Sequence, residues 1–183
     1  MWYVLHVQTG KESEIRKQLS RKGYTAYAPV EQRLIHSGGN WQDKPYTLFP
    51  GYLFICLDMD DEVYYRVKST PGVIRFLGHE SPVPLRETEE EYILLLCHKG
   101  HPVKPSKVRV LPDGSAVVVG GVLEKLRGRI VKIDKHSRKA TVEVTFCGNP
   151  KQIKLSVDIV EDQRKDAADA ARLMRPGRNK PPK

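Results

Sequence analysis

Three side chains near the middle of the chain are of types that bind zinc: Cys97, His98 and His101. A closed structural zinc site needs four ligands, and no second pair of cysteines or histidines stands at metal-binding spacing. The stretch Gly10-Lys11-Glu12-Ser13 resembles the end of a phosphate-binding loop, but the earlier glycine of that motif is missing. Because both patterns are incomplete, we expect neither a metal site nor a nucleotide-binding loop.

Catalytic residue types are not grouped in any pattern that supports a reaction. The glutamates at 89–91 precede an apolar helical run, where they suit the positive end of a helix dipole better than catalysis. Cys56, Cys97 and Cys147 are far apart in the sequence, which predicts reduced, packed thiols and no disulfide framework. We therefore expect a non-enzymatic protein with no cofactor.

Basic residues are concentrated in the second half of the chain. Residues 1–100 carry 12 Lys/Arg and 13 Asp/Glu, residues 101–160 carry 12 and 5, and the whole chain has a net charge of +9. A region this basic repels itself unless it binds phosphates, so nucleic acid is the expected partner, and a solvated basic face is the alternative. Aromatic residues that could stack on bases are scarce there, which favours structured RNA over a single strand. The expected RNA-binding residues are Lys125, Arg127, Arg129, Lys132, Lys135, His136, Arg138, Lys139, Lys151 and Lys154.

The elements that would position these residues divide the chain into parts. Over residues 1–100, apolar periodicity predicts strands at 2–7, 53–57 and 73–78, helices at 11–22, 58–69 and 88–100, and an extended hairpin around Gly38-Gly39. Thr88 and Glu91 fit a capping box at the start of the last helix. This mixture predicts an α+β domain, with strands of a sheet covered by helices.

The remaining residues follow different patterns. Residues 101–114 contain three prolines and are predicted as a linker, although 107–111 could form a short strand. Alternating apolar residues between turns predict a small β-barrel over 115–161, in which Ile130, Val131 and Ile133 would fill the interior. The composition of residues 162–183 predicts a basic, disordered tail. With neither a membrane span nor a signal sequence in view, we expect a monomer in the cytoplasm.

One short stretch combines two features that seldom occur together. In Phe49-Pro50-Gly51-Tyr52-Leu53-Phe54-Ile55, an apolar strand follows a Pro-Gly turn that is flanked by two aromatic residues. Pro fixes φ and Gly permits φ > 0, so this turn is sharp and rigid. Either the aromatic residues pack in the core, or the turn presents them to another protein.

Four motifs in order resemble the NusG family of transcription elongation factors. They are WYVLHVQTGKESEIRKQL, FPGYLFI, VKSTPGVIRFLG followed by PVPLRETEEEYI, and GGVLEKLRGRIVKID. The resemblance covers about residues 1–160 and implies an amino-terminal NusG domain (1–100) and an SH3-like β-barrel KOW domain (115–161). It also implies binding to the clamp helices of RNA polymerase, next to upstream DNA.

The resemblance assigns roles to individual residues. The implied RNA polymerase contacts are Phe49, Tyr52, Trp2, Tyr92 and Leu96. The implied contacts to the non-template DNA strand are Ser69, Thr70 and Arg75.

The barrel departs from the general factor of the family. That factor carries two phenylalanines in a loop used with Rho or a ribosomal protein, where this chain has Leu123 and Leu126. The hairpin adds a second variable surface, with His36 and Trp41. These departures resemble the specialised paralogs, most of all the LoaP group, in which an RNA hairpin recruits an antiterminator to its operon. The alternatives are a general factor that couples RNA polymerase to Rho or the ribosome, and an RNA- or ribosome-binding protein with no polymerase role.

Overall fold

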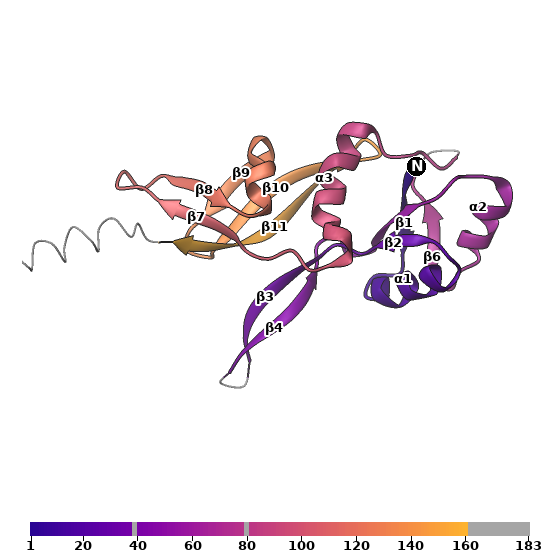
Figure 1. Ribbon diagram of the computed structural model, residues 1–183, viewed down its shortest axis with the longest axis horizontal. Coiled ribbons are helices and arrows are strands. Elements are labelled where there is room, and N and C mark those ends of the chain that lie inside the picture. The colour runs from indigo at the N-terminus through magenta and orange to yellow at the C-terminus, as the bar shows by residue number, and fades with distance from the viewer. Residues whose placement is uncertain (38–39, 79–80, 161–183) are drawn as a thin grey trace, which may run out of the picture.

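The structure, a computed structural model, describes residues 1–37, 40–78 and 81–160, and gives no side-chain detail for 34–43. The side chains of the predicted surface at His36 and Trp41 are therefore not described, and the predicted tail at 162–183 lies outside the described residues. Figure 1 shows two β-sheets with a helix standing between them and a long hairpin that extends away from both. None of the described helices is long and apolar enough to cross a membrane.

The N-terminal sheet has four antiparallel strands in the order β2-β5-β1-β6. The strands are β1 (Trp2–Val7), β2 (Thr25–Tyr27), β5 (Tyr52–Cys56) and β6 (Val73–Phe76). The helices of this half are α1 (Glu12–Arg21), α2 (Asp61–Lys68) and α3 (Glu87–Cys97), which continues into a 3₁₀ turn, η1 (His98–Gly100). This is the α+β arrangement that the sequence predicts.

Both faces of the N-terminal sheet are buried, because successive side chains of a strand point to opposite sides. Leu5 and Ile55 pack in one cluster with residues of α1 and α2. Val4 and Phe54 belong to a second cluster, which contains residues of α3 and of the C-terminal sheet. The central strands therefore lack a polar face, and the second sheet covers part of the first.

The start of α3 differs from the predicted capping box. The backbone N–H of Arg86 donates to the Glu89 carboxylate at 3.1 Å, so the box forms two residues earlier than the predicted pair Thr88 and Glu91. The cause lies just before the helix, where Leu85 is buried and its N–H donates to the carbonyl of β1 at 2.8 Å. Because this hydrogen bond fixes Leu85 against β1, the helix can begin directly after it, with Arg86 as its N-cap.

The predicted hairpin consists of β3 (Val30–Ser37) and β4 (Asn40–Thr47), paired along their whole length. The connection to the second half of the chain is attached to its base. The N–H of Val103 donates to the carbonyl of Val30 at 2.8 Å, and the N–H of Gln32 donates to the carbonyl of Val103 at 2.9 Å. Two backbone hydrogen bonds thus join the start of the linker to the hairpin.

The C-terminal sheet has five strands in the order β8-β7-β11-β10-β9. They are β7 (Ser106–Val110), β8 (Ala116–Gly120), β9 (Ile130–Asp134), β10 (Lys139–Phe146) and β11 (Asn149–Val160). Between β8 and β9 lie a helical turn, α4 (Val122–Lys125), and a 3₁₀ turn, η2 (Arg127–Arg129). Strand β7 pairs parallel with β11, whereas the other pairs are antiparallel.

The short strand that the sequence left open within the predicted linker 101–114 forms as β7, and its central residue Val108 is fully buried between β8 and β11. One expectation for this half needs correction. Val131 was expected inside, but it is 57% exposed, because β9 is an edge strand whose register with β10 shifts between Thr141 and Val142. Ile130 and Ile133 are half-buried against the core, as expected.

Candidate binding surfaces

The buried carboxylate of Glu12 stabilises the turn before β5 through hydrogen bonds. Gly51 has φ +82°, and a Cβ there would lie 3.0 Å from the Thr9 hydroxyl. Glu12, 5% exposed, accepts hydrogen bonds through Oε1 from the N–H of Gly51 at 2.7 Å and of Gly10 at 3.0 Å. In the sequence, Glu12 was considered only as part of an incomplete phosphate loop. Its role is to fix the turn, and the sequence signal was its place two residues after Gly10.

The aromatic residues of that turn pack against the C-terminal sheet. The ring of Phe146, at the end of β10, lies with its centroid 5.6 Å from Phe49, 5.3 Å from Tyr52 and 5.6 Å from Phe54. Phe146 is fully buried and Phe49 is 3% exposed. The sequence left open whether these aromatic residues pack in the core or form a docking surface, and here both descriptions apply. The turn presents its rings to another part of the same chain.

The other predicted polymerase contacts share this surface. We call it the aromatic patch, and it comprises Trp2, Phe49, Tyr52, Tyr92 and Leu96. Leu96 is fully buried, and Trp2 is half-buried with its ring stacked on Tyr27 at 5.5 Å. We call the placement of the C-terminal sheet on this patch the docked arrangement.

Tyr92 makes the most specific contacts between the two sheets. Its hydroxyl accepts from the N–H of Thr145 at 3.0 Å and donates to the carbonyl of the same residue. The guanidinium carbon of Arg129 lies 3.9 Å from the centre of the Tyr92 ring. Burial is the main cause that raises the pKa of Tyr92, so the phenol stays protonated and can donate.

Two further contacts connect the halves of the chain. At the end of β10, the N–H of Gly148 donates to Glu89 at 3.3 Å, and burial together with this carboxylate raises the pKa of Cys147 to about 11. At the base of the hairpin, the fully buried Glu31 accepts from Arg33 Nε at 2.5 Å and from the backbone N–H at position 156. Arg33 also donates to the carbonyl of Lys154 at 2.8 Å.

The predicted DNA contacts are not equally available. Thr70 is 1% exposed, and its hydroxyl accepts from Lys22 Nζ at 2.7 Å, so it has no surface to offer DNA in this arrangement. Ser69 and Arg75 are exposed. Arg75 lies on β6, an edge strand of the N-terminal sheet.

The ten predicted RNA-binding residues fall into two groups. Seven are exposed: Lys125, Arg127, Lys132, Lys135, His136, Arg138 and Lys154. The other three, Arg129, Lys139 and Lys151, are half-buried. Arg129 lies over Tyr92, and Lys151 Nζ lies 5.5 Å from the ring of Tyr52. Lys139 donates to the Ser156 hydroxyl at 3.2 Å, and its pKa is lowered, mainly by burial and then by neighbouring Arg33.

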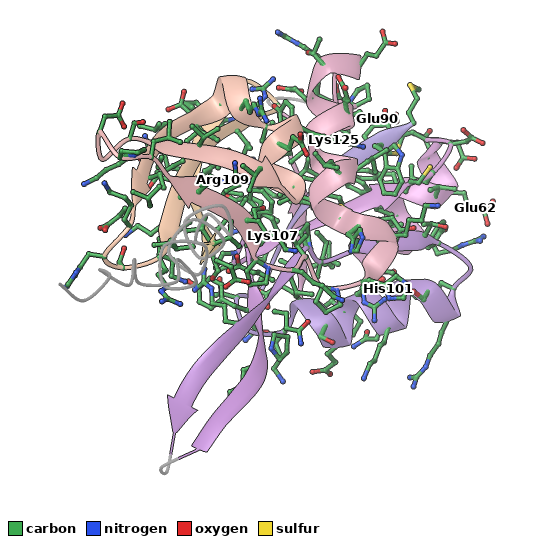
Figure 2. All side chains as sticks on the ribbon, turned by 60° about the vertical axis from the view of Figure 1, so that its left-hand side comes forward. Glu62, Glu90, His101, Lys107, Arg109 and Lys125 are labelled. Carbon is green, nitrogen blue, oxygen red and sulfur yellow. The ribbon has the colours of Figure 1, made fainter. Side chains whose placement is uncertain are left out.

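Two cations that the sequence reasoning missed add to this basic surface. Lys107 and Arg109 alternate on β7, and Lys107 pairs with Gly120 just ahead of α4. Figure 2 shows both residues on the same side of the C-terminal sheet as Lys125. They were overlooked because their segment was assigned to a linker. The period-two alternation of Lys107, Val108 and Arg109 is the signal that could have identified them.

The incomplete zinc pattern stays incomplete. The His98 and His101 rings lie 6.2 Å apart, while Cys97 is buried in the core and its pKa is raised by burial. Among the described residues, no group of three or more His, Cys, Asp or Glu side chains could hold a metal ion.

The chain is similar in sequence to known proteins over most of its length. Relatives called transcription termination/antitermination protein NusG include that of Thermus thermophilus, 29% identical over 172 residues (84% of this chain, 94% of the relative). Those of Staphylococcus carnosus and Bacillus subtilis are 27% and 26% identical, over 87% and 84% of this chain and 94% and 93% of the relatives. A solved structure described as "Domain interaction in Thermotoga maritima NusG" is 24% identical, covers 85% of this chain and 93% of its own, and has a TM-score of 0.47.

The protein-family comparison covers just over half of the chain. Residues 1–94 match the family "Transcription termination factor nusG". These residues include the turn before β5, the four strands of the N-terminal sheet and most of α3. The chain therefore belongs to the NusG family of transcription termination factors.

Proposed function

We propose that this protein is an elongation factor that docks its aromatic patch on RNA polymerase and promotes antitermination at selected operons. Structured nascent RNA recruits it through the exposed cations of the C-terminal sheet, which forms an SH3-like KOW domain. The observation that supports polymerase docking is the packing of the Phe146 ring against Phe49, Tyr52 and Phe54. A surface that already accepts an aromatic side chain from another sheet is built to bind protein.

The patch has the composition of an interaction hot spot. Aromatic anchors in an apolar, fully desolvated pocket supply most of the free energy at protein interfaces. Since the C-terminal sheet covers this surface, polymerase and the sheet compete for it. The active form is then the undocked one.

Polymerase docking is tested with purified full-length protein and core RNA polymerase. The Phe49→Ala/Tyr52→Ala variant should lose binding by about three orders of magnitude, because hot-spot truncations cost roughly 2 kcal/mol or more each. Tyr65→Ala is the matched control, since Tyr65 lies on α2 and is 67% exposed. Thermal unfolding of both variants checks whether the fold is retained. Equal binding by the double variant and the control would reject the polymerase role and leave an RNA- or ribosome-binding protein.

The structure favours the specialised, LoaP-like role over the general one. Leu123 and Leu126, which replace the aromatic pair of the general factor, are 0% and 2% exposed. They fill the core under α4 and η2 and cannot be offered to Rho or a ribosomal protein. Lys125 and Arg127 on the same turns are exposed. This surface therefore suits phosphates better than an apolar partner.

Recruitment by RNA is tested by binding to leader-RNA hairpins and to unrelated duplexes across a salt series. Selective binding that persists at physiological salt supports the specialised role. Weak binding to every RNA, with a steep loss of affinity as salt rises, is typical of generic phosphate contacts. In that case the alternative of a general elongation factor remains, and the protein should occupy most transcribed genes in cells instead of a few.

A further inference from the structure

A pocket of about 320 Å³ lies where the N-terminal and C-terminal sheets meet. The N-terminal half contributes His6, Tyr52 and Arg75, and the C-terminal half contributes Cys147, Asn149 and Lys151. Pockets for small ligands have volumes of about 300–1,000 Å³, so this one has room for a group the size of a nucleotide. Among the described residues that line it, none is a carboxylate.

The charged lining comes from both halves of the chain. Arg75 is exposed on β6, and Lys151 is half-buried on β11. The family resemblance assigns Arg75 to DNA, and the charge pattern of the sequence assigns Lys151 to RNA. Both residues nevertheless line this one pocket. Arg presents a planar fork of donors that matches a phosphate, and Lys adds a point charge. Two cations without a lining carboxylate select for an anion.

The rest of the lining suits a flat ring with polar edges. The His6 ring is stacked on Tyr52, with centroids 5.5 Å apart and planes 25° apart. Asn149 is exposed and also lines the pocket, and its amide nitrogen donates to the carbonyl of Cys147 at 3.0 Å. Nucleobases stack on aromatic rings and form hydrogen bonds through their edges.

We propose that this pocket binds one nucleotide of a nucleic-acid strand, with Arg75 and Lys151 on the phosphate and the His6–Tyr52 pair against the base. The binding site rests on the proposed function in taking nucleic acid as the partner, and its regulatory consequence rests also on the proposed docking of RNA polymerase at Tyr52. A free nucleotide offers the same chemistry, and the experiment below separates the two.

The pocket has a consequence for regulation. Because its two cations belong to different sheets, it is complete only in the docked arrangement. A ligand that binds one state and not the other stabilises that state. A nucleotide in the pocket therefore holds the chain docked, and it competes with RNA polymerase because both need Tyr52. By linkage, polymerase weakens nucleotide binding by the same factor.

Cys147 provides a reporter within the pocket, because its thiol is half-buried there. Full-length protein is alkylated with N-ethylmaleimide, and the rate at Cys147 is followed by peptide mass spectrometry, with buried Cys97 as the internal reference. A short single-stranded RNA at ten times its dissociation constant should slow alkylation roughly tenfold. ATP and inorganic phosphate, at the same concentration as the RNA, should leave the rate unchanged. Stronger protection by ATP than by RNA would overturn the assignment to a strand.

Charge variants from both halves test whether the pocket is composite. Arg75→Gln and Lys151→Gln should each weaken RNA protection of Cys147 about tenfold and lower the salt slope of binding by about one. Lys17→Gln, which removes an exposed cation on α1 that does not line the pocket, should leave protection unchanged. If RNA binds but never protects Cys147, this inference fails while the proposed function stands. If hairpin RNA binds only generically, as the salt series would show, recruitment by RNA fails instead, and protection by short strands is judged separately.

Discussion

At the scale of single residues, the hydroxyl of Tyr92 separates docking within the chain from docking on polymerase. Tyr92→Phe removes the group that pairs with both the N–H and the carbonyl of Thr145 and leaves those groups unsatisfied, at a cost of about 1–3 kcal/mol. The ring remains for an apolar partner. We expect faster alkylation of Cys147 and unchanged or tighter polymerase binding. Tyr65→Phe on exposed α2 is the control, and an unchanged alkylation rate in Tyr92→Phe would contradict this role.

The thiol of Cys147 makes the docked arrangement sensitive to alkaline pH. Burial and Glu89 raise its pKa from 9.0 to about 11, so the undocked form loses its proton first as pH rises. The stabilisation of docking is complete below pH 9 and is lost between about pH 9 and 11. Alkylation of the folded chain should therefore keep accelerating up to about pH 11, whereas the urea-unfolded chain should level off near pH 9. An inflection at pH 9 in both would show that Cys147 is exposed in the folded protein.

At the scale of elements, the turn before β5 depends on a glycine for two separate reasons. Gly51→Ala adds a side chain at φ +82° and places its Cβ 3.0 Å from the Thr9 hydroxyl. Gly23→Ala, after α1, has a similar φ of +89° with nothing within 4 Å, so it isolates the backbone term of about 1–2 kcal/mol. We expect Gly51→Ala to lower the free energy of unfolding more than Gly23→Ala does, as measured in urea. Equal losses would mean that the contact with Thr9 is relieved at no cost.

Elements with local periodicity were predictable, and those defined by distant partners were not. Helix α1 and strands β1, β5, β10 and β11 follow patterns of 3.6 or two residues that are visible in the sequence. Strand β7 lies between prolines, so the sequence offered it only as an alternative to a linker, and it pairs in parallel with β11, more than forty residues later. The exposure of Val131 likewise depends on the edge position of β9, which no local pattern reveals. The turn residues Phe49 and Tyr52 could be singled out from the sequence, but not the ring that covers them.

At the scale of the whole molecule, Phe146 determines which partner occupies the aromatic patch. Phe146→Ala removes the ring that touches Phe49, Tyr52 and Phe54, and truncation of a buried phenylalanine costs roughly 3–5 kcal/mol. If the docked arrangement holds about 99% of the free protein, opening it should tighten the apparent affinity for polymerase up to about a hundredfold, because only the undocked fraction binds. Titration of core RNA polymerase with full-length variants measures this gain, and Cys147 alkylation reports the opening.

The matched control must lose as much core packing without opening the interface. Phe76→Ala meets this condition, since Phe76 is 6% exposed and packs on Tyr3 and Tyr64 in the other core cluster. It should lower the free energy of unfolding yet leave polymerase affinity as it is. Should Phe146→Ala unfold the C-terminal sheet, Tyr92→Phe still weakens the interface while it keeps the buried ring of Tyr92 in the core. Polymerase affinity that stays constant across Phe146→Ala and Tyr92→Phe, while alkylation of Cys147 accelerates, would mean that polymerase binds elsewhere. The aromatic patch would then serve only the chain itself.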